Sequence, residues 1–168
     1  MIAVADGVGG WNDRGVDPAL FSKELCQHVI DNYQKELREK KELYEVDVKT
    51  LLVESVKLTK PMGSSTFVMA ILNEKDAMLR TLNLGDSAYI LLRPDGKGGL
   101  DQIFKSTEQQ YGYDFPFQCG TNCDLPYDAD CTLHLVKNND IVVMGSDGVF
   151  DNLFDKEIKS CVNEHLSQ

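Results

Sequence analysis

Apolar and polar residues follow a helical pattern over the first third of this chain. After Asp17-Pro18, apolar residues recur about every four positions (Leu25, Val29, Tyr33 and Leu37, with Cys26 and Ile30 beside them). This spacing predicts a long amphipathic helix, and an aspartate followed by proline is typical of a helix N-terminus. A second helix is expected after Asp47. Its inward face would be Val48, Leu51, Leu52, Ser55 and Val56.

The rest of the chain is dominated by short apolar runs that predict strands. These runs are residues 2–5, 66–72, 78–84, 88–92, 100–104, 132–136 and 141–144. Residues 78–84 do not alternate cleanly, which predicts a strand covered on both faces. The sequence Asn138-Asn139-Asp140 predicts a hairpin between the last two strands, and residues 93–99 predict another. Asp151 to His165 is expected to form a final helix, with Leu153, Phe154, Ile158, Val162 and Leu166 facing inward.

The order of these elements indicates the fold class. A strand and two helices precede a meander of strands joined by short turns, and a helix follows. Such an order is typical of the α+β class, an antiparallel sheet with segregated helices. With 168 residues, the chain is expected to form a single domain, residues 1–168.

Charge and composition narrow the function classes. The net charge of −10 argues against binding nucleic acid or an anionic membrane surface. No apolar run approaches the length of a transmembrane span, and the N-terminus lacks the pattern of a signal peptide. An odd number of cysteines, five, without such a signal suggests reduced thiols in an intracellular protein.

Three cysteines and a histidine form a candidate zinc set. Cys119, Cys123, Cys131 and His134 have a spacing that fits no standard ligand pairing. Cys131 and His134 lie three apart in a predicted strand, so their side chains should point to opposite faces. Free thiols are therefore the favoured interpretation.

Three apolar runs end in an aspartate next to glycine: Asp6, Asp86 and Asp147. An Asp-Gly after a strand is a common turn, so each motif alone has a structural explanation. Three carboxylates on strand ends can, however, converge on one point, and glycine leaves room for an ion. Carboxylate, carbonyl and water are the preferred ligands of Mg²⁺ and Mn²⁺.

Other catalytic arrangements find little support. The chain has no Gly-x4-Gly-Lys loop for nucleotide phosphates and no Gly-x-Ser-x-Gly nucleophile motif. Its histidines, His28, His134 and His165, fall in helix or strand patterns away from the glycine turns. Any catalysis is therefore expected to be metal–water chemistry.

The chain resembles the metal-dependent protein phosphatases, the protein phosphatase 2C family. The resemblance covers nearly the whole chain and rests on four ordered motifs: Val4-Ala5-Asp6-Gly7-Val8-Gly9-Gly10, Gly63-Ser64-Ser65-Thr66, Asn83-Leu84-Gly85-Asp86-Ser87 and Ser146-Asp147-Gly148-Val149-Phe150-Asp151-Asn152. The opening motif with Trp11, Gln109-Gln110 and Phe115-Pro116-Phe117-Gln118 resembles the compact branch known from mitochondria and plastids. A mitochondrial location is an expectation from that resemblance.

The resemblance implies a β-sandwich of two antiparallel sheets flanked by helices, with two Mg²⁺ or Mn²⁺ ions at one end. By motif match, Asp6 would bridge the two ions, the Gly7 carbonyl would bind the second and Asp147 the first. Asp86 resembles a ligand of a weaker third ion. A metal-bridging water would attack the phosphorus of phosphoserine or phosphothreonine proteins directly. The protein is expected to be a monomer.

The chain also departs from the family pattern. Val8 stands where many relatives have a histidine proposed as the general acid. The family's upstream phosphate-gripping arginine and Glu-Asp pair, and its late metal-binding aspartate, are expected to lie outside this chain, so the domain would be incomplete at both ends. Two interpretations remain open: an active Mg/Mn-dependent serine/threonine phosphatase, or a non-catalytic phosphatase-like interaction module. A calcium-binding module lacks its Asp-x-Asp-x-Asp-Gly loop.

The segment 106–128 is predicted to be a long polar and aromatic loop. Loops of this length are often functional. We hypothesise that it shapes substrate access, with Phe115 and Phe117 affecting a phosphoprotein substrate more than a small aryl phosphate.

Overall fold

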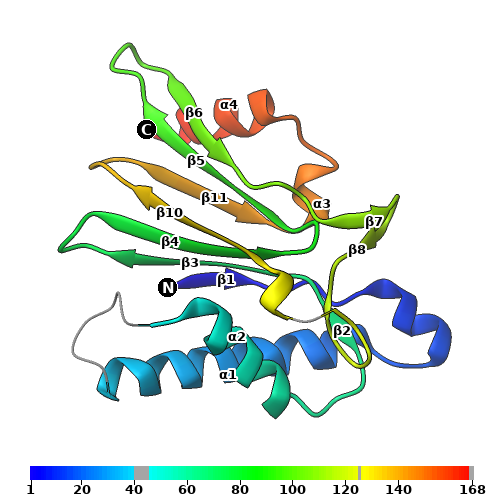
Figure 1. Cartoon of the computed structure of the whole chain (residues 1–168). Coiled ribbons are helices and arrows are strands. Elements are labelled where there is room, and N and C mark those ends of the chain that lie inside the picture. Colours follow the sequence, from blue (N-terminus) through cyan, green and yellow to red (C-terminus); the bar gives the residue numbers. More distant parts are fainter. Residues whose placement is uncertain (40–45, 125, 167–168) are drawn as a thin grey trace.

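The computed structural model of the chain describes residues 1–39, 46–124 and 126–166. Two antiparallel sheets lie face to face, with helices on both outer faces (Figure 1). The helices are α1 (Pro18–Glu39), α2 (Val48–Leu58), α3 (Asp147–Phe150) and α4 (Asp155–Leu166), with short 3-10 turns η1 (Gly9–Arg14) and η3 (Pro126–Asp128). The strands of the two sheets are β1 (Ile2–Val4), β3 (Phe67–Asn73), β4 (Met78–Leu84), β5 (Ala88–Pro94), β6 (Leu100–Lys105), β10 (Asp130–Leu135) and β11 (Ile141–Gly145).

The first sheet has the strand order β1-β3-β4-β10 and the second β11-β5-β6. Helices α1 and α2 cover the outer face of the first sheet, and α4 covers the second (Figure 1). Between the sheets lies a small apolar layer that includes Ala70, Leu79 and Leu91. The predicted α+β sandwich is confirmed, and the prediction that residues 78–84 are covered on both faces agrees with the two packed layers.

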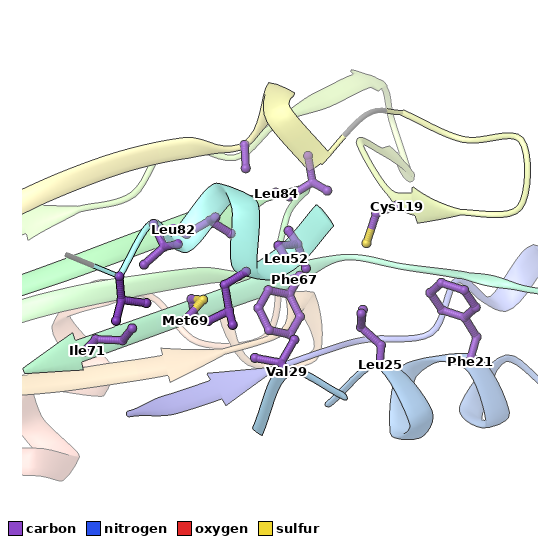
Figure 2. Close-up of a cluster of buried hydrophobic side chains, with 14 residues drawn as sticks. Phe21, Leu25, Val29, Leu52, Phe67, Met69, Ile71, Leu82, Leu84 and Cys119 are labelled. Atoms are coloured by element: carbon purple, nitrogen blue, oxygen red, sulfur yellow. The ribbon is translucent and has the colours of Figure 1, made fainter. Parts of the chain in front are cut away.

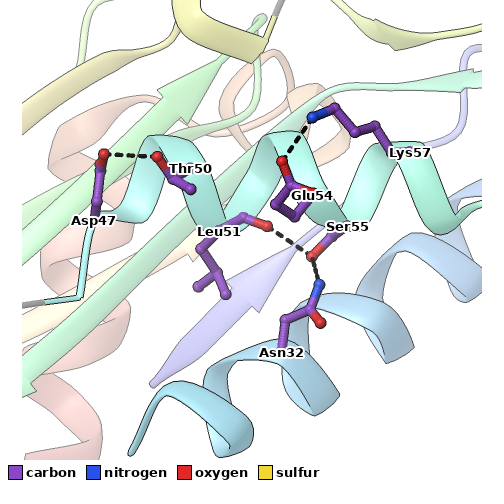
Figure 3. A network of polar contacts seen from close by, with 7 residues as sticks. All are labelled: Asn32, Asp47, Thr50, Leu51, Glu54, Ser55 and Lys57. Carbon is purple, nitrogen blue, oxygen red and sulfur yellow. Dashed lines mark hydrogen bonds and ion pairs between the residues drawn. The ribbon is translucent and has the colours of Figure 1, made fainter. Parts of the chain in front are cut away.

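The two long helices begin where the sequence predicts. The amide of Ala19 donates to Asp17 Oδ1 at 2.9 Å, and the amide of Lys49 donates to Asp47 Oδ1 at 3.0 Å. Each aspartate thus satisfies an amide in the first turn of a helix, where no intrahelical partner exists. The Thr50 hydroxyl also donates to Asp47, as Figure 3 shows.

The largest part of the core lies between these helices and the first sheet (Figure 2). Leu25 and Val29 of α1 and Leu52 of α2 pack there with at most 1% of their surface exposed. The predicted stripe on α1 is wrong at Ile30 and Leu37, which are each 41% exposed. A polar contact joins the two helices, because Asn32 Nδ2 donates to Ser55 Oγ at 3.0 Å (Figure 3).

The predicted hairpin at Asn138-Asn139-Asp140 is wrong. Strand β10 pairs with β4 in the first sheet, whereas β11 pairs with β5 in the second. The connection therefore crosses between the sheets. It is held by Arg93, whose Nε and Nη2 donate to Asp140 Oδ1 and Oδ2 at 2.7 and 2.6 Å. The bend at Gly85 makes the same kind of crossing, from β4 to β5.

The predicted C-terminal helix is also corrected. The chain forms the single turn α3 and then the separate helix α4. The amide of Phe154 donates to Glu157 Oε2 at 2.8 Å, which places the start of α4 after residue 154. Of the predicted inward face, Ile158 is buried and Val162 packs beside it. Leu153, Phe154 and Leu166 are exposed.

The edges and loops differ from expectation in detail. The first predicted strand, residues 2–5, forms as β1, which lies at the edge of its sheet with Ile2 51% exposed. The predicted loop at 106–128, in which residue 125 lies outside the described part, contains three short strands: β7 (Gln110–Gly112), β8 (Phe115–Pro116) and β9 (Cys119–Gly120). Strand β9 pairs with β2 (Ser64–Ser65). None of the helices in the described ranges has the length and apolarity that a bilayer span requires.

Candidate metal centre

Asp6 follows β1 and is fixed through its backbone. Its carbonyl accepts hydrogen bonds from the amide of Thr66 at 3.0 Å and from the hydroxyl of Ser65 at 2.8 Å. Gly7 is required at the next position, because a Cβ there would lie 2.4 Å from the carbonyl oxygen of Pro18. The start of α1 therefore packs directly against the turn that carries the carboxylate.

Asp147 follows β11 and opens α3. Its Oδ1 accepts a hydrogen bond from the amide of Gly148 at 2.6 Å. The turn is closed by a hydrogen bond from the amide of Val149 to the Ser146 carbonyl at 2.9 Å. A Cβ at Gly145 would lie 2.8 Å from the side chain of Val149, so the end of the strand packs closely on the helical turn.

Asp86 lies in the crossing turn between β4 and β5 and is only 6% exposed. Gln110 Nε2 donates to its Oδ2 at 3.2 Å. Gly85 has φ +99°, a conformation that favours glycine, and a Cβ there would lie 2.5 Å from the Phe117 carbonyl oxygen. The turn thus holds the carboxylate under the segment that carries β7 and β8.

All four predicted site residues line one cavity of about 250 Å³. They are Asp6, Gly7, Asp86 and Asp147, and the cavity lies where β1 and β4 of one sheet and β11 of the other come to an end. Within the described ranges, no three His, Cys, Asp or Glu side chains are drawn together closely enough to form a ready ligand set. The carboxylates therefore share a cavity without meeting at one point.

The pKa values of two carboxyls in this cavity are raised. Burial raises the pKa of Asp6, and a hydrogen bond and the charge of Asp147 raise it further, against a smaller lowering by Ser146. Burial, and then the charge of Asp147, raise the pKa of Asp86 to about 6, although the hydrogen bond from Gln110 opposes this shift. Both shifts therefore come first from burial and second from the neighbouring Asp147.

The residues fit a hard divalent cation. The donors in the cavity are carboxylate oxygens and backbone carbonyls, which suit Mg²⁺ and Mn²⁺ rather than softer metals. A cation there would remove the repulsion that raises the pKa of Asp6 and Asp86. The structure also adds Asp114 to this cavity. No sequence motif marks Asp114, and only its place in the long 106–128 segment hinted at a role.

The alternative zinc set has other partners. The Cys119 thiol is buried and donates to the Ser65 carbonyl at 3.5 Å. His134 Nε2 shares a hydrogen bond of 2.8 Å with the Tyr89 hydroxyl. All five cysteines are free thiols.

A second, larger cavity of about 810 Å³ adjoins the first. Val8, Gly10 and Asp114 line both, and the larger one also has Trp11 and Tyr111 in its walls. The site therefore consists of a small carboxylate cavity that opens beside a wider cleft.

No family model matches the chain. Individual relatives do. Probable protein phosphatase 2C 80 of Arabidopsis thaliana is 36% identical over 163 residues, which cover 96% of this chain and 37% of the relative. The human protein phosphatase PTC7 homolog is 33% identical over 98% of this chain and 57% of its own length. The solved structure of the photosystem II phosphatase PBCP superposes with a TM-score of 0.82 at 35% identity, over 96% of this chain and 60% of that one.

The chain belongs to the metal-dependent protein phosphatase family of the 2C type. It spans about half or less of the first curated relatives that it matches. The catalytic domain of the serine/threonine protein phosphatase PstP, solved in complex with two manganese ions, has the same fold at 18% identity and a TM-score of 0.60. The family is metal-dependent, in agreement with the carboxylate chemistry of the cavity.

Proposed function

We propose that residues 1–168 form one phosphatase-like domain of a Mg²⁺- or Mn²⁺-dependent protein serine/threonine phosphatase. The observation that carries this proposal is that Asp6 and Asp147, which follow strands of different sheets, line one small cavity. The names of the relatives, all protein phosphatases, support the reaction class. No observation on the described residues favours the non-catalytic alternative.

In this proposal Asp6, the Gly7 carbonyl and Asp147 hold two divalent ions, and Asp86 contributes to a weaker third site. The manganese ions of PstP support the choice of metal and the number two. Bound ions would lower the pKa of a water and neutralise the charge of the phosphoryl group. Ser65 and Thr66 fix the backbone of Asp6, which holds the turn that carries its carboxylate in place.

Other residues set limits on the chemistry. Gln110 orients the Asp86 carboxylate by its 3.2 Å hydrogen bond. Val8 lines the same cavity but has no proton to donate, so the leaving oxygen must take its proton from water or from another group. The substrates are proposed to be phosphoserine and phosphothreonine proteins. The monomeric state and an intracellular, mitochondrial location stay predictions.

The test is hydrolysis of a small aryl phosphate by this chain, with and without Mn²⁺. We expect activity that requires Mn²⁺ and falls by at least about a hundredfold in Asp147→Asn, because a lost ligand removes ion and water together. Asp101→Asn is the matched control, since Asp101 is exposed on β6, away from both cavities. Equal activity in Asp147→Asn, or no Mn²⁺-dependent hydrolysis, would contradict the proposal for this chain.

A further inference from the structure

The larger cavity forms a cleft with aromatic walls beside the carboxylates. Trp11 of η1 forms one wall, and Tyr111 of β7 and Phe115 of β8 form the other. The cleft is continuous with the carboxylate cavity, because Val8 and Asp114 line both. A phosphoresidue whose phosphate enters the small cavity therefore has its neighbouring residues next to these rings.

A chain of hydrogen bonds ties the two walls together. Trp11 Nε1 donates to Ser64 Oγ at 2.6 Å, and the Ser64 hydroxyl donates to Gln118 Oε1 at 2.5 Å. The backbone amide of Gln118 in turn donates to Asp124 Oδ2 at 3.0 Å, and the Tyr111 hydroxyl donates to the same carboxylate. Ser64 is fully buried and Gln118 is 8% exposed. Trp11 and Tyr111 are therefore linked through one chain of hydrogen bonds whose centre, at Ser64 and Gln118, is buried.

Ring contacts hold the aromatic groups in place on each side. The Tyr111 ring stacks on Phe117 with centroids 4.4 Å apart and lies 5.4 Å from Phe115. In the part of the cleft formed by η1, the Arg14 guanidinium lies over the Trp11 ring, 5.2 Å from its centroid. Side chains fixed in this way lose little conformational entropy when a ligand enters, which favours binding.

The charges in the cleft indicate what kind of side chain it takes. Asp114 stands at the junction of the two cavities, and Asp124 lies in the larger one. Arg14 is the one cation among the described residues that line the cleft, and it already covers Trp11. An acidic neighbour of the phosphoresidue would meet Asp114, whereas a large apolar side chain would meet the rings.

We propose that this cleft selects phosphoprotein segments that carry a large apolar or aromatic residue next to the phosphoresidue. The inference rests on the proposed function, and it names the substrate class of the same site. The rings of Trp11, Tyr111 and Phe115 would enclose that side chain, which gains the free energy of apolar burial and aromatic contact. The carboxylate cavity would meanwhile hold the phosphoryl group.

Trp11 is the single tryptophan of the chain, so its fluorescence reports on the cleft directly. The experiment titrates the chain, with Mn²⁺ present, with two short phosphothreonine peptides that differ only in phenylalanine or alanine beside the phosphothreonine. We expect the phenylalanine peptide to bind about tenfold more tightly, a difference of about 1.4 kcal/mol. A peptide with glutamate at that position should bind no better than the alanine peptide.

Phe115→Ala should reduce the tenfold difference to less than about twofold, since it removes one of the three rings of the cleft and leaves the Trp11 signal intact. Phe115 is 55% exposed, so this variant is expected to fold, and circular dichroism checks it. Phe154→Ala is the matched control, because Phe154 is 72% exposed and lines neither cavity. It should keep the tenfold difference.

Equal binding of the phenylalanine and alanine peptides, no binding of either, or a preference for glutamate would overturn the inference. So would an undiminished difference in Phe115→Ala. Hydrolysis of the small aryl phosphate is scored separately, because that substrate has no flanking residue. Hydrolysis without peptide discrimination would refute the cleft alone, whereas discrimination without hydrolysis would support the cleft and refute the proposed activity.

Discussion

Two acidic side chains carry the chemical character of this protein. Asp6 and Asp147 are held close together, although burial, and then a hydrogen bond and the charge of Asp147, raise the pKa of Asp6. This proximity is enforced by backbone features: the close approach of Gly7 to Pro18, and the hydrogen bond from the Gly148 amide to Asp147. A fold that keeps like charges together at a cost in stability is what a metal or catalytic site requires.

Asp86 gives this cost a measurable pH dependence. Its pKa is raised from 3.8 to about 6 in the folded, metal-free chain. The folded state therefore binds the proton more tightly than the unfolded state, and this contribution to stability is present below pH 4 and lost as pH rises through 6. We expect Asp86→Asn to raise the free energy of unfolding at pH 8 by about 1 kcal/mol, less than the full shift implies because solvent reaches the cavity.

Thermal unfolding in a chelator at pH 5 and pH 8 measures this effect. The gain in Asp86→Asn should be largest at pH 8 and roughly half as large at pH 5, because pH 5 lies between the unfolded pKa of 3.8 and the folded pKa of about 6. Asp101→Asn, an exposed carboxylate on β6, should show no such dependence. If wild type and Asp86→Asn lost the same stability between the two pH values, the buried carboxylate would not be the source of the effect.

The helices and strands hold the site through their outer layers. Helix α1 begins directly beside Gly7, and its buried face packs with α2 on the sheet that carries β1 and β4 (Figure 2). Only part of the predicted apolar stripe of α1 packs against the sheet. The helix extends beyond the sheet-facing core, so that Leu25 is fully buried and Leu37 is 41% exposed.

This difference along α1 predicts very different costs for the same substitution. Leu25→Ala should lower the free energy of unfolding by about 3 kcal/mol, because it leaves a cavity in a closely packed core. Leu37→Ala should cost less than about 0.5 kcal/mol, since no such cavity forms. Urea denaturation of the two variants measures both values. Similar losses in the two variants would mean that the whole predicted stripe is buried after all.

How far the sequence predicted this structure depended on the range of the interactions involved. Asp17 and Asp47 act within three residues of themselves, and both helix starts were predicted correctly. The crossing at Asn139 was not, because a turn between sheets and a hairpin turn share the same local signals. Only the long-range pairing of β10 with β4 and of β11 with β5 separates them.

In the candidate site, too, the features that depend on local sequence were predicted and those that depend on long-range contacts were not. Its four predicted residues lie in local Asp-Gly motifs, and the structure brings all four to one cavity. Asp114 and the wall residue Arg14 carry no such motif, and they reach the site only because the 106–128 segment and η1 fold back beside it. The pKa shifts of Asp6 and Asp86 likewise depend on burial and on a partner far away in sequence.

The two sheets together create the site, because β1 and β4 come from one and β11 from the other (Figure 1). Neither sheet alone would bring Asp6 to Asp147. The central claim is therefore that these two carboxylates bind a divalent cation jointly. Calorimetric titration of the metal-free chain with Mn²⁺ at neutral pH tests it most directly, with Asp6→Asn, Asp147→Asn and the control Asp101→Asn alongside.

We predict saturable Mn²⁺ binding to the wild type, accompanied by proton release because bound metal requires ionised ligands. Affinity should fall at least about tenfold in both Asp6→Asn and Asp147→Asn, since each removes an anionic ligand, and should be unchanged in Asp101→Asn. Wild-type affinity in both site variants would contradict the account, because the metal would then bind elsewhere on the chain.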